Sequence, residues 1–163
     1  MNTRRGLHLV ATYLGIGYAK KAPGTVATFA TIPLVILLSW AGPFLYMAAV
    51  LLLIPLAIIA AAAYEQDHLH ADFGDGHDRS EIVIDEVVGF LITMVWLPMT
   101  WQSLLMGFLL FRFFDILKPF PIGYLDRKVP GGLGVVVDDI AAGIFASLIL
   151  QAVYSYTSIL GQQ

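Results

Sequence analysis

The chain has 163 residues, of which 58% are hydrophobic and only 13% are charged, and its mean hydropathy is +0.79. Soluble domains are about 45–50% apolar and about 25% charged, so this composition indicates a membrane protein. The absence of cysteine excludes a thiolate nucleophile, a cysteine-ligated zinc and a disulfide framework. The net charge of −3 comes without a basic stripe, so nucleic acid is not an expected partner.

The first 21 residues resemble the start of a signal peptide, but their apolar stretch is short and lacks a small-residue cleavage site. We expect them to belong to the mature protein. Beyond them, three segments reach the roughly 20 residues that a membrane-spanning helix needs. They are 23–40, 44–63 and 134–160.

Two shorter apolar segments, 87–98 and 101–116, lie between the second and third long ones. They predict a helical hairpin that turns at 98–100, and whether this hairpin spans the membrane or only enters it is left open. We therefore predict an all-α, polytopic membrane bundle with three full spans and a shorter hairpin, in one domain covering 1–163.

The basic residues predict which end of the bundle faces the cytoplasm. None lies in the turns at 41–43 and 98–100, and none follows residue 128. A chain that crosses at each predicted segment therefore keeps all nine on one side, which the positive-inside rule makes cytoplasmic. They are Arg4, Arg5, Lys20, Lys21, Arg79, Arg112, Lys118, Arg127 and Lys128.

The predicted topology brings five carboxylates to this cytoplasmic depth. They are Asp85, Glu86, Asp115, Asp138 and Asp139. One interpretation is that they cap helix starts, where unpaired N–H groups and the helix dipole favour an anion. Adjacent residues point about 100° apart on a helix, however, so only one of each pair can cap. Asp115 lies at a predicted helix end, where the dipole disfavours it.

The second interpretation is that the acids converge on a divalent cation. Oxygen-only ligands favour Mg²⁺ over zinc. Small residues near the acids, Gly89 and 141–143, would let helices approach each other closely in lipid.

Cationic side chains accompany the acids. Arg112 and Lys118 each lie three residues from Asp115, either as simple ion pairs or as ligands for a phosphate. Lys21 and Thr25 belong to the stretch KKAPGT at a helix start, which is a possible phosphate site. Arg127 would attract anionic lipid head groups. Together these residues suggest a phosphate-bearing lipid as the substrate.

Four sequence blocks now point to a known family. They are KAPGT at 21–25, DRSEIVIDEVVGF at 78–90, FRFFDILKPFPI at 111–122 and GGLGVVVDDIAAG at 131–143. In these blocks and their order the chain resembles the phosphatidylglycerophosphatase A family of bacterial membrane phosphatases. Departures from the family pattern fall in the N-terminal block, where 27–28 reads Ala-Thr, and at Arg79.

The resemblance implies Mg²⁺-dependent hydrolysis of phosphatidylglycerophosphate to phosphatidylglycerol and inorganic phosphate. It implies a multi-pass protein of the bacterial inner membrane, with membrane lipids as its surroundings and the active site facing the cytoplasm. The motif match makes the five acids the catalytic and metal-binding set, and places Arg112 and Lys118 on a family Arg and Lys. Asp78 and His8 also match residues that related sequences carry.

Several alternatives stay open at this point. An ion- or proton-coupled transporter would also use membrane carboxylates, although it predicts them at mid-membrane depth. A CDP-alcohol phosphotransferase strings its aspartates along one motif, and a scaffold has no need of five acids. Attack by water and attack by a carboxylate are both compatible with the residues, and the oligomeric state is not predicted.

Overall fold

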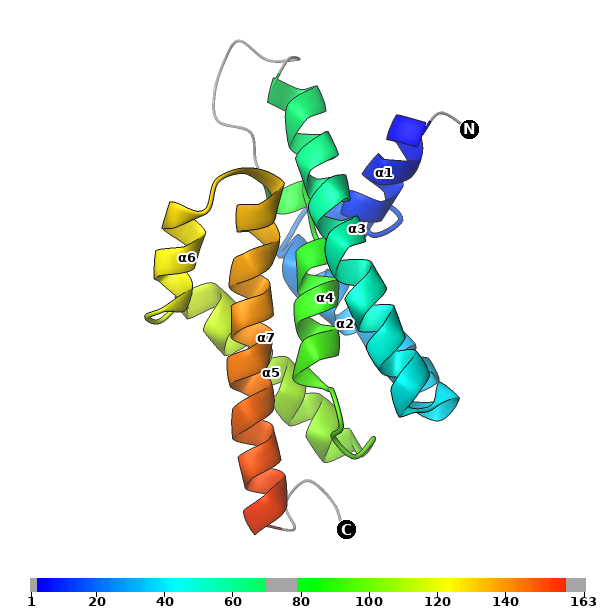
Figure 1. Cartoon of the computed structure of the whole chain (residues 1–163), viewed down its shortest axis with the longest axis vertical. Helices are drawn as coiled ribbons and strands as arrows, with labels where there is room; N and C mark the ends of the chain where they lie inside the picture. The colour runs from blue at the N-terminus through cyan, green and yellow to red at the C-terminus, as the bar shows by residue number, and fades with distance from the viewer. Residues whose placement is uncertain (1–2, 70–78, 158–163) are drawn as a thin grey trace.

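The structure, a computed structural model, describes residues 3–69 and 79–157, so Asp78 lies outside the described residues. Within these ranges it holds seven α-helices, two short 3-10 helices and no strand (Figure 1). The elements are α1 Thr3–Ala11, η1 Ile16–Tyr18, α2 Pro23–Ala41, α3 Pro43–Leu69, η2 Arg79–Glu81, α4 Ile84–Thr93, α5 Trp101–Leu117, α6 Ile122–Lys128 and α7 Gly131–Tyr156. The prediction of an all-α fold is confirmed.

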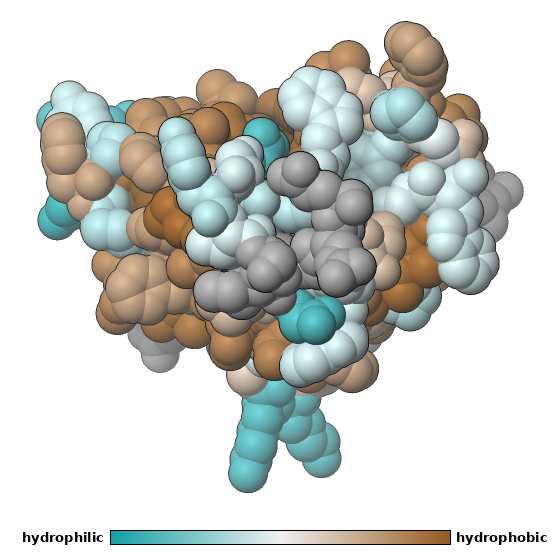
Figure 2. Space-filling model, turned by 90° about the horizontal axis from the view of Figure 1, so that it is seen from below, coloured by the Kyte–Doolittle hydropathy of each residue, from teal (hydrophilic) through white to brown (hydrophobic). Residues whose placement is uncertain are grey.

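Three of these helices are long and apolar enough to cross a membrane, namely α2, α3 and α7. This confirms the prediction of three full spans. Leu51, Leu52 and Ile59 on α3 are among the large hydrophobic side chains that stay exposed, as lipid-facing residues would. Figure 2 shows hydrophobic residues over much of the face seen from below.

The predicted hairpin corresponds to α4 and α5, which are joined by residues 94–100. The first arm is shorter than predicted: it begins at Ile84 and ends at Thr93. Ten residues of helix rise only about 15 Å, half of a bilayer core. α4 is nevertheless the centre of the fold, because it packs against α7, α2 and α3 and most of its residues are buried (Figure 1).

Glycines bring α4 and α7 almost into backbone contact. A Cβ on Gly143 would lie 2.4 Å from the carbonyl oxygen of Gly89, and one on Gly89 would lie 2.8 Å from that of Asp139. No real Cβ tolerates these distances, so glycine is required at both positions. The prediction that small residues let these helices approach closely is confirmed, and the approach aligns the polar stretch of α7 with the start of α4.

Two short helices were not predicted from the sequence. The first, α1, packs against α3, and the Ala11 carbonyl accepts a hydrogen bond of 2.9 Å from the Val83 N–H just before α4. The second, α6, packs against α7 and α5. The last helix also begins at Gly131, three residues earlier than predicted.

Candidate active site

Three acids converge where the start of α4 meets α7. One carboxylate oxygen from each of Asp85, Glu86 and Asp139 lies within 4.8 Å of the other two. Asp85 is 9% exposed and Asp139 is 3% exposed, so the cluster is almost closed to solvent. Asp85 and Glu86 come from the first turn of α4, whereas Asp139 comes from the interior of α7.

Helix capping does not account for this cluster. The residue that precedes α4 is Val83, and no side chain caps that helix start. Asp138 and Asp139 lie about two turns inside α7, because the helix begins at Gly131. The expectation that these two lie at the helix start was wrong, since the Gly-rich segment 131–134 is helical rather than a connection.

Four buried carboxylate oxygens have no hydrogen-bond partner among the described residues. They are Asp85 Oδ1, Glu86 Oε2, Asp138 Oδ1 and Asp139 Oδ2. Burying a carboxylate oxygen without a partner costs several kcal/mol or changes its protonation, so native proteins rarely leave such groups unexplained. Hard oxygen donors at this spacing suit a magnesium ion, and the donor set fits that cofactor.

The pKa values of the two acids in the first turn of α4 also favour a cation site. Burial raises the pKa of Asp85 well above its usual value, and the negative charge of Glu86 raises it further. Burial also raises the pKa of Glu86. A bound divalent cation inverts this balance, because it favours the ionised form of every carboxylate around it.

Asp115 is engaged by a cation instead of joining the cluster directly. Its Oδ2 accepts a hydrogen bond of 2.5 Å from Arg112 Nη1, and the same nitrogen lies 3.7 Å from Glu86 Oε1. The Arg112 side chain is 14% exposed, and its Nε–H has no hydrogen-bond partner in the described structure. Arg112 therefore links α5 to the acid cluster and keeps one donor unused.

Asp138 is engaged in a similar way by Lys118. Lys118 Nζ lies 2.5 Å from Asp138 Oδ2 and 2.8 Å from Asp126 Oδ1. The sequence did not single out Asp126. Its place depends on α6, which was not predicted, so no pattern in the sequence marked it.

The N-terminal block KAPGT reaches the site through its glycine. A Cβ on Gly24 would lie 1.9 Å from Glu86 Oε1 and 3.1 Å from Arg112 Nη1, so the first turn of α2 packs directly on these two side chains. Lys21 is exposed and Thr25 is half-buried. Arg127 is also exposed, and its Nε–H donates to the Gly123 carbonyl at 2.9 Å within α6.

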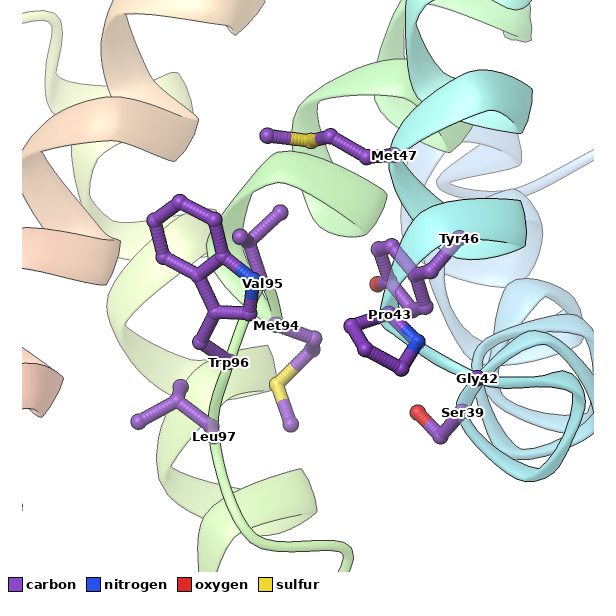
Figure 3. A pocket seen from close by; sticks show the side chains of 9 residues that line it. All are labelled: Ser39, Gly42, Pro43, Tyr46, Met47, Met94, Val95, Trp96 and Leu97. Atoms are coloured by element: carbon purple, nitrogen blue, oxygen red, sulfur yellow. The ribbon is translucent and has the colours of Figure 1, made fainter.

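A cavity of about 130 Å³ lies at the opposite end of α4 (Figure 3). It is lined by the α2–α3 turn with the start of α3 and by the end of α4 with the connection that follows it. Its lining carries no acid or cation, so it does not belong to the acid cluster. The lining residues are Ser39, Gly42, Pro43, Tyr46, Met47, Met94, Val95, Trp96 and Leu97.

Comparison with known proteins relates this chain to a family. Residues 9–154 match the family model described as phosphatidylglycerophosphatase A. The chain is 42% identical over 151 residues to phosphatidylglycerophosphatase A of Haemophilus influenzae, covering 90% of this chain and 88% of that protein. It is 38% identical over 144 residues to phosphatidylglycerophosphatase A of Escherichia coli, covering 88% and 80%.

A third relative carries a different name. The chain is 32% identical over 149 residues to a Bacteroides thetaiotaomicron protein that is provisionally named a phosphatidylinositol-3-phosphatase, covering 87% of this chain and 89% of that protein. No solved structure matches the chain. A family model that covers most of the chain, together with these relatives, shows that the chain belongs to the phosphatidylglycerophosphatase A family of phosphatases.

Proposed function

We propose that this phosphatase hydrolyses phosphatidylglycerophosphate to phosphatidylglycerol and inorganic phosphate, with Mg²⁺ held by Asp85, Glu86 and Asp139. The observation that carries the proposal is the buried trio of carboxylates, which have unpartnered oxygens and lie beside the guanidinium of Arg112. The family's name supports phosphatidylglycerophosphate as the substrate.

The proposal assigns different tasks to the five acids. Asp85, Glu86 and Asp139 face one another and would hold the metal. Asp115 and Asp138 instead hold Arg112 and Lys118 through hydrogen bonds of 2.5 Å each. This division narrows the expectation that all five are metal ligands.

When bound, Mg²⁺ would supply electrostatic stabilisation of the phosphate oxygens and of the developing charge on the leaving group. Arg112 would add to this stabilisation, because its Nε–H is unpartnered while Asp115 fixes its Nη1. A guanidinium held in this way presents its donors in the geometry that a phosphate accepts. Lys118 would provide the second positive charge.

The basic residues support a cytoplasmic active site. Three basic residues precede α2 in the chain, namely Arg4, Lys20 and Lys21. Arg79 lies shortly before α4, and Lys118 directly follows α5. These segments join helices at the end of the bundle that carries the acid cluster. By the positive-inside rule we expect that end to face the cytoplasm, and the bacterial relatives support an inner-membrane location.

A transporter is the weaker proposal. Carboxylates on a transport path are expected at mid-membrane depth. Here the metal-binding trio gathers at the first turn of α4, while the cavity at the far end of that helix has no acid or cation in its lining.

The test is phosphate release from phosphatidylglycerophosphate by the purified chain in detergent, with and without Mg²⁺. We expect release only with the metal, and loss of at least about a hundredfold in kcat for Asp139→Asn. Phosphatidylinositol-3-phosphate and phosphatidic acid, assayed in parallel, define which head group is preferred. A folded, Mg²⁺-supplied protein that releases no phosphate from phosphatidylglycerophosphate would refute the proposal.

A further inference from the structure

Lys118 directly follows the last residue of α5, and its backbone lies in the left-handed region at φ 42° and ψ 55°. Residues other than glycine rarely adopt this conformation, and they persist in it where the surrounding structure holds them and a function depends on them. Here the Lys118 N–H donates to the Phe114 carbonyl at 2.9 Å, and the Lys118 carbonyl accepts from the Gly123 N–H at 3.2 Å. A Cβ on Gly123 would lie 2.6 Å from that carbonyl oxygen, so this contact requires glycine.

The side chain of Lys118 is held from two directions. Its ammonium donates to Asp126 Oδ1 at 2.8 Å from α6 and to Asp138 Oδ2 at 2.5 Å from α7. An ammonium has three N–H donors, so the two carboxylates leave one. Two hydrogen bonds to separate helices determine the direction of the third donor, whereas one bond would let the ammonium rotate.

The two carboxylates differ in depth. The Asp138 side chain is 5% exposed and the Asp126 side chain is 39% exposed, so Asp126 lies on the solvent side of the pair. Burial alone would lower the pKa of Lys118, but the hydrogen bonds to Asp126 and Asp138 outweigh it and raise the pKa above its ordinary value. The hydrogen bonds therefore favour the charged ammonium, and Asp126 supplies the more exposed of its two acceptors.

We propose that Asp126 is a positioning residue of the active site, which holds the Lys118 ammonium beside Asp138 with one N–H directed to an oxygen of the substrate's phosphate. This inference rests on the proposed phosphatase function. Gly123 and Asp126 lie three residues apart, on one face of α6, so this helix holds both the backbone and the side chain of Lys118. We name these two residues the α6 clamp.

The experiment is a double-mutant cycle of Asp126→Asn and Lys118→Met in the full chain in detergent. Three quantities are measured: the KM for phosphatidylglycerophosphate, the binding of inorganic phosphate followed by ³¹P NMR, and the affinity for Mn²⁺ followed by electron paramagnetic resonance. The control is Asp67→Asn, because Asp67 also pairs with cations, Arg4 and His8, but lies at the contact between α1 and α3.

We expect Asp126→Asn to raise the KM and to weaken phosphate binding by about tenfold, since a misdirected donor loses most of its contribution. Mn²⁺ affinity should stay within about twofold, because Asp126 is not in the metal-binding trio. In the Lys118→Met background the same change should have no further effect. The control should match the unmodified chain in all three measurements.

Independent, multiplying effects of the two changes would overturn the proposal, as would a parallel loss of Mn²⁺ binding. If Asp126→Asn does not fold, Gly123→Ala tests the α6 clamp through the backbone and should weaken phosphate binding in the same way. An unmodified chain that releases no phosphate would instead refute the proposed function, so the two failures are distinguishable.

Discussion

Gly24→Ala is the substitution whose effect can be worked out most directly from the structure. The added Cβ would lie 1.9 Å from Glu86 Oε1, whereas real Cβ contacts essentially never fall below 3.0 Å. The carboxylate must therefore move by at least 1.1 Å, the difference between these two distances. That movement takes Glu86 out of its present position beside Asp85 and Asp139.

Stability and activity should respond differently to this change. Overpacking costs about 1–3 kcal/mol, while alanine in place of glycine in a helix returns about 1 kcal/mol. The atom that must move is also the end of a flexible side chain, so we expect a net loss of unfolding free energy of no more than about 2 kcal/mol. A displacement of about 1 Å in a catalytic group, by contrast, can cost about a hundredfold in rate.

The assay measures kcat, Mg²⁺ affinity and the midpoint of thermal unfolding in detergent. Gly6→Ala is the matched control, because the same added methyl group at Gly6 in α1 meets nothing within 4 Å. The second variant combines Gly24→Ala with Glu86→Asp, which shortens the carboxylate side chain by one methylene. We expect this combination to bind Mg²⁺ more tightly than Gly24→Ala alone. A Gly24→Ala protein with unchanged kcat and Mg²⁺ affinity would refute the placement of Glu86 in the site.

Three further predictions concern the separate tasks of the acids, the guanidinium of Arg112 and the pH dependence of stability. Asp139→Asn should abolish Mn²⁺ binding measured by electron paramagnetic resonance, whereas Asp115→Asn should retain it and raise the KM about tenfold; equal loss of Mn²⁺ binding in both would contradict separate tasks. Arg112→Lys should lower kcat/KM by about tenfold or more although the positive charge is kept, because lysine lacks the rigid planar fork with which a guanidinium donates to a carboxylate and a phosphate. The metal-free protein should lose thermal stability as the pH rises from about 4 towards neutral, because the raised pKa of Asp85 in the folded state means that this carboxyl ionises at a lower pH in the unfolded chain. Added Mg²⁺ should reverse this trend, and a metal-free melting temperature that rises over this range would contradict the prediction.

The hydrophobic segments were readable from the sequence because a membrane-spanning helix is a local property. Its length is set by the bilayer and its composition by the lipid, so α2, α3 and α7 appear as apolar runs without any knowledge of their neighbours. The helix α6 could not be found in this way. It has seven residues, and its packing against α7 and α5 supports it rather than an apolar run of its own.

The acids were recognisable from the sequence because a carboxylate within an apolar run is costly wherever the helix packs. Which acids face each other was decided by the tertiary structure. Gly89 and Gly143 set the separation of α4 and α7, and this close approach places Asp139 with Asp85 while turning Asp138 towards Lys118. Neighbours in sequence thus enter different environments, because successive positions on a helix point about 100° apart.

The sequence by itself determined the class of protein, the three long helices and the residue types of the site. The tertiary structure decided that α4 is a short buried helix, that Gly24 packs against Glu86, and that Asp126 shares Lys118 with Asp138. The physical reason is that hydrophobicity and charge act residue by residue, whereas a site depends on distances between helices. Those distances are set by packing between residues far apart in the chain, and no local pattern records them.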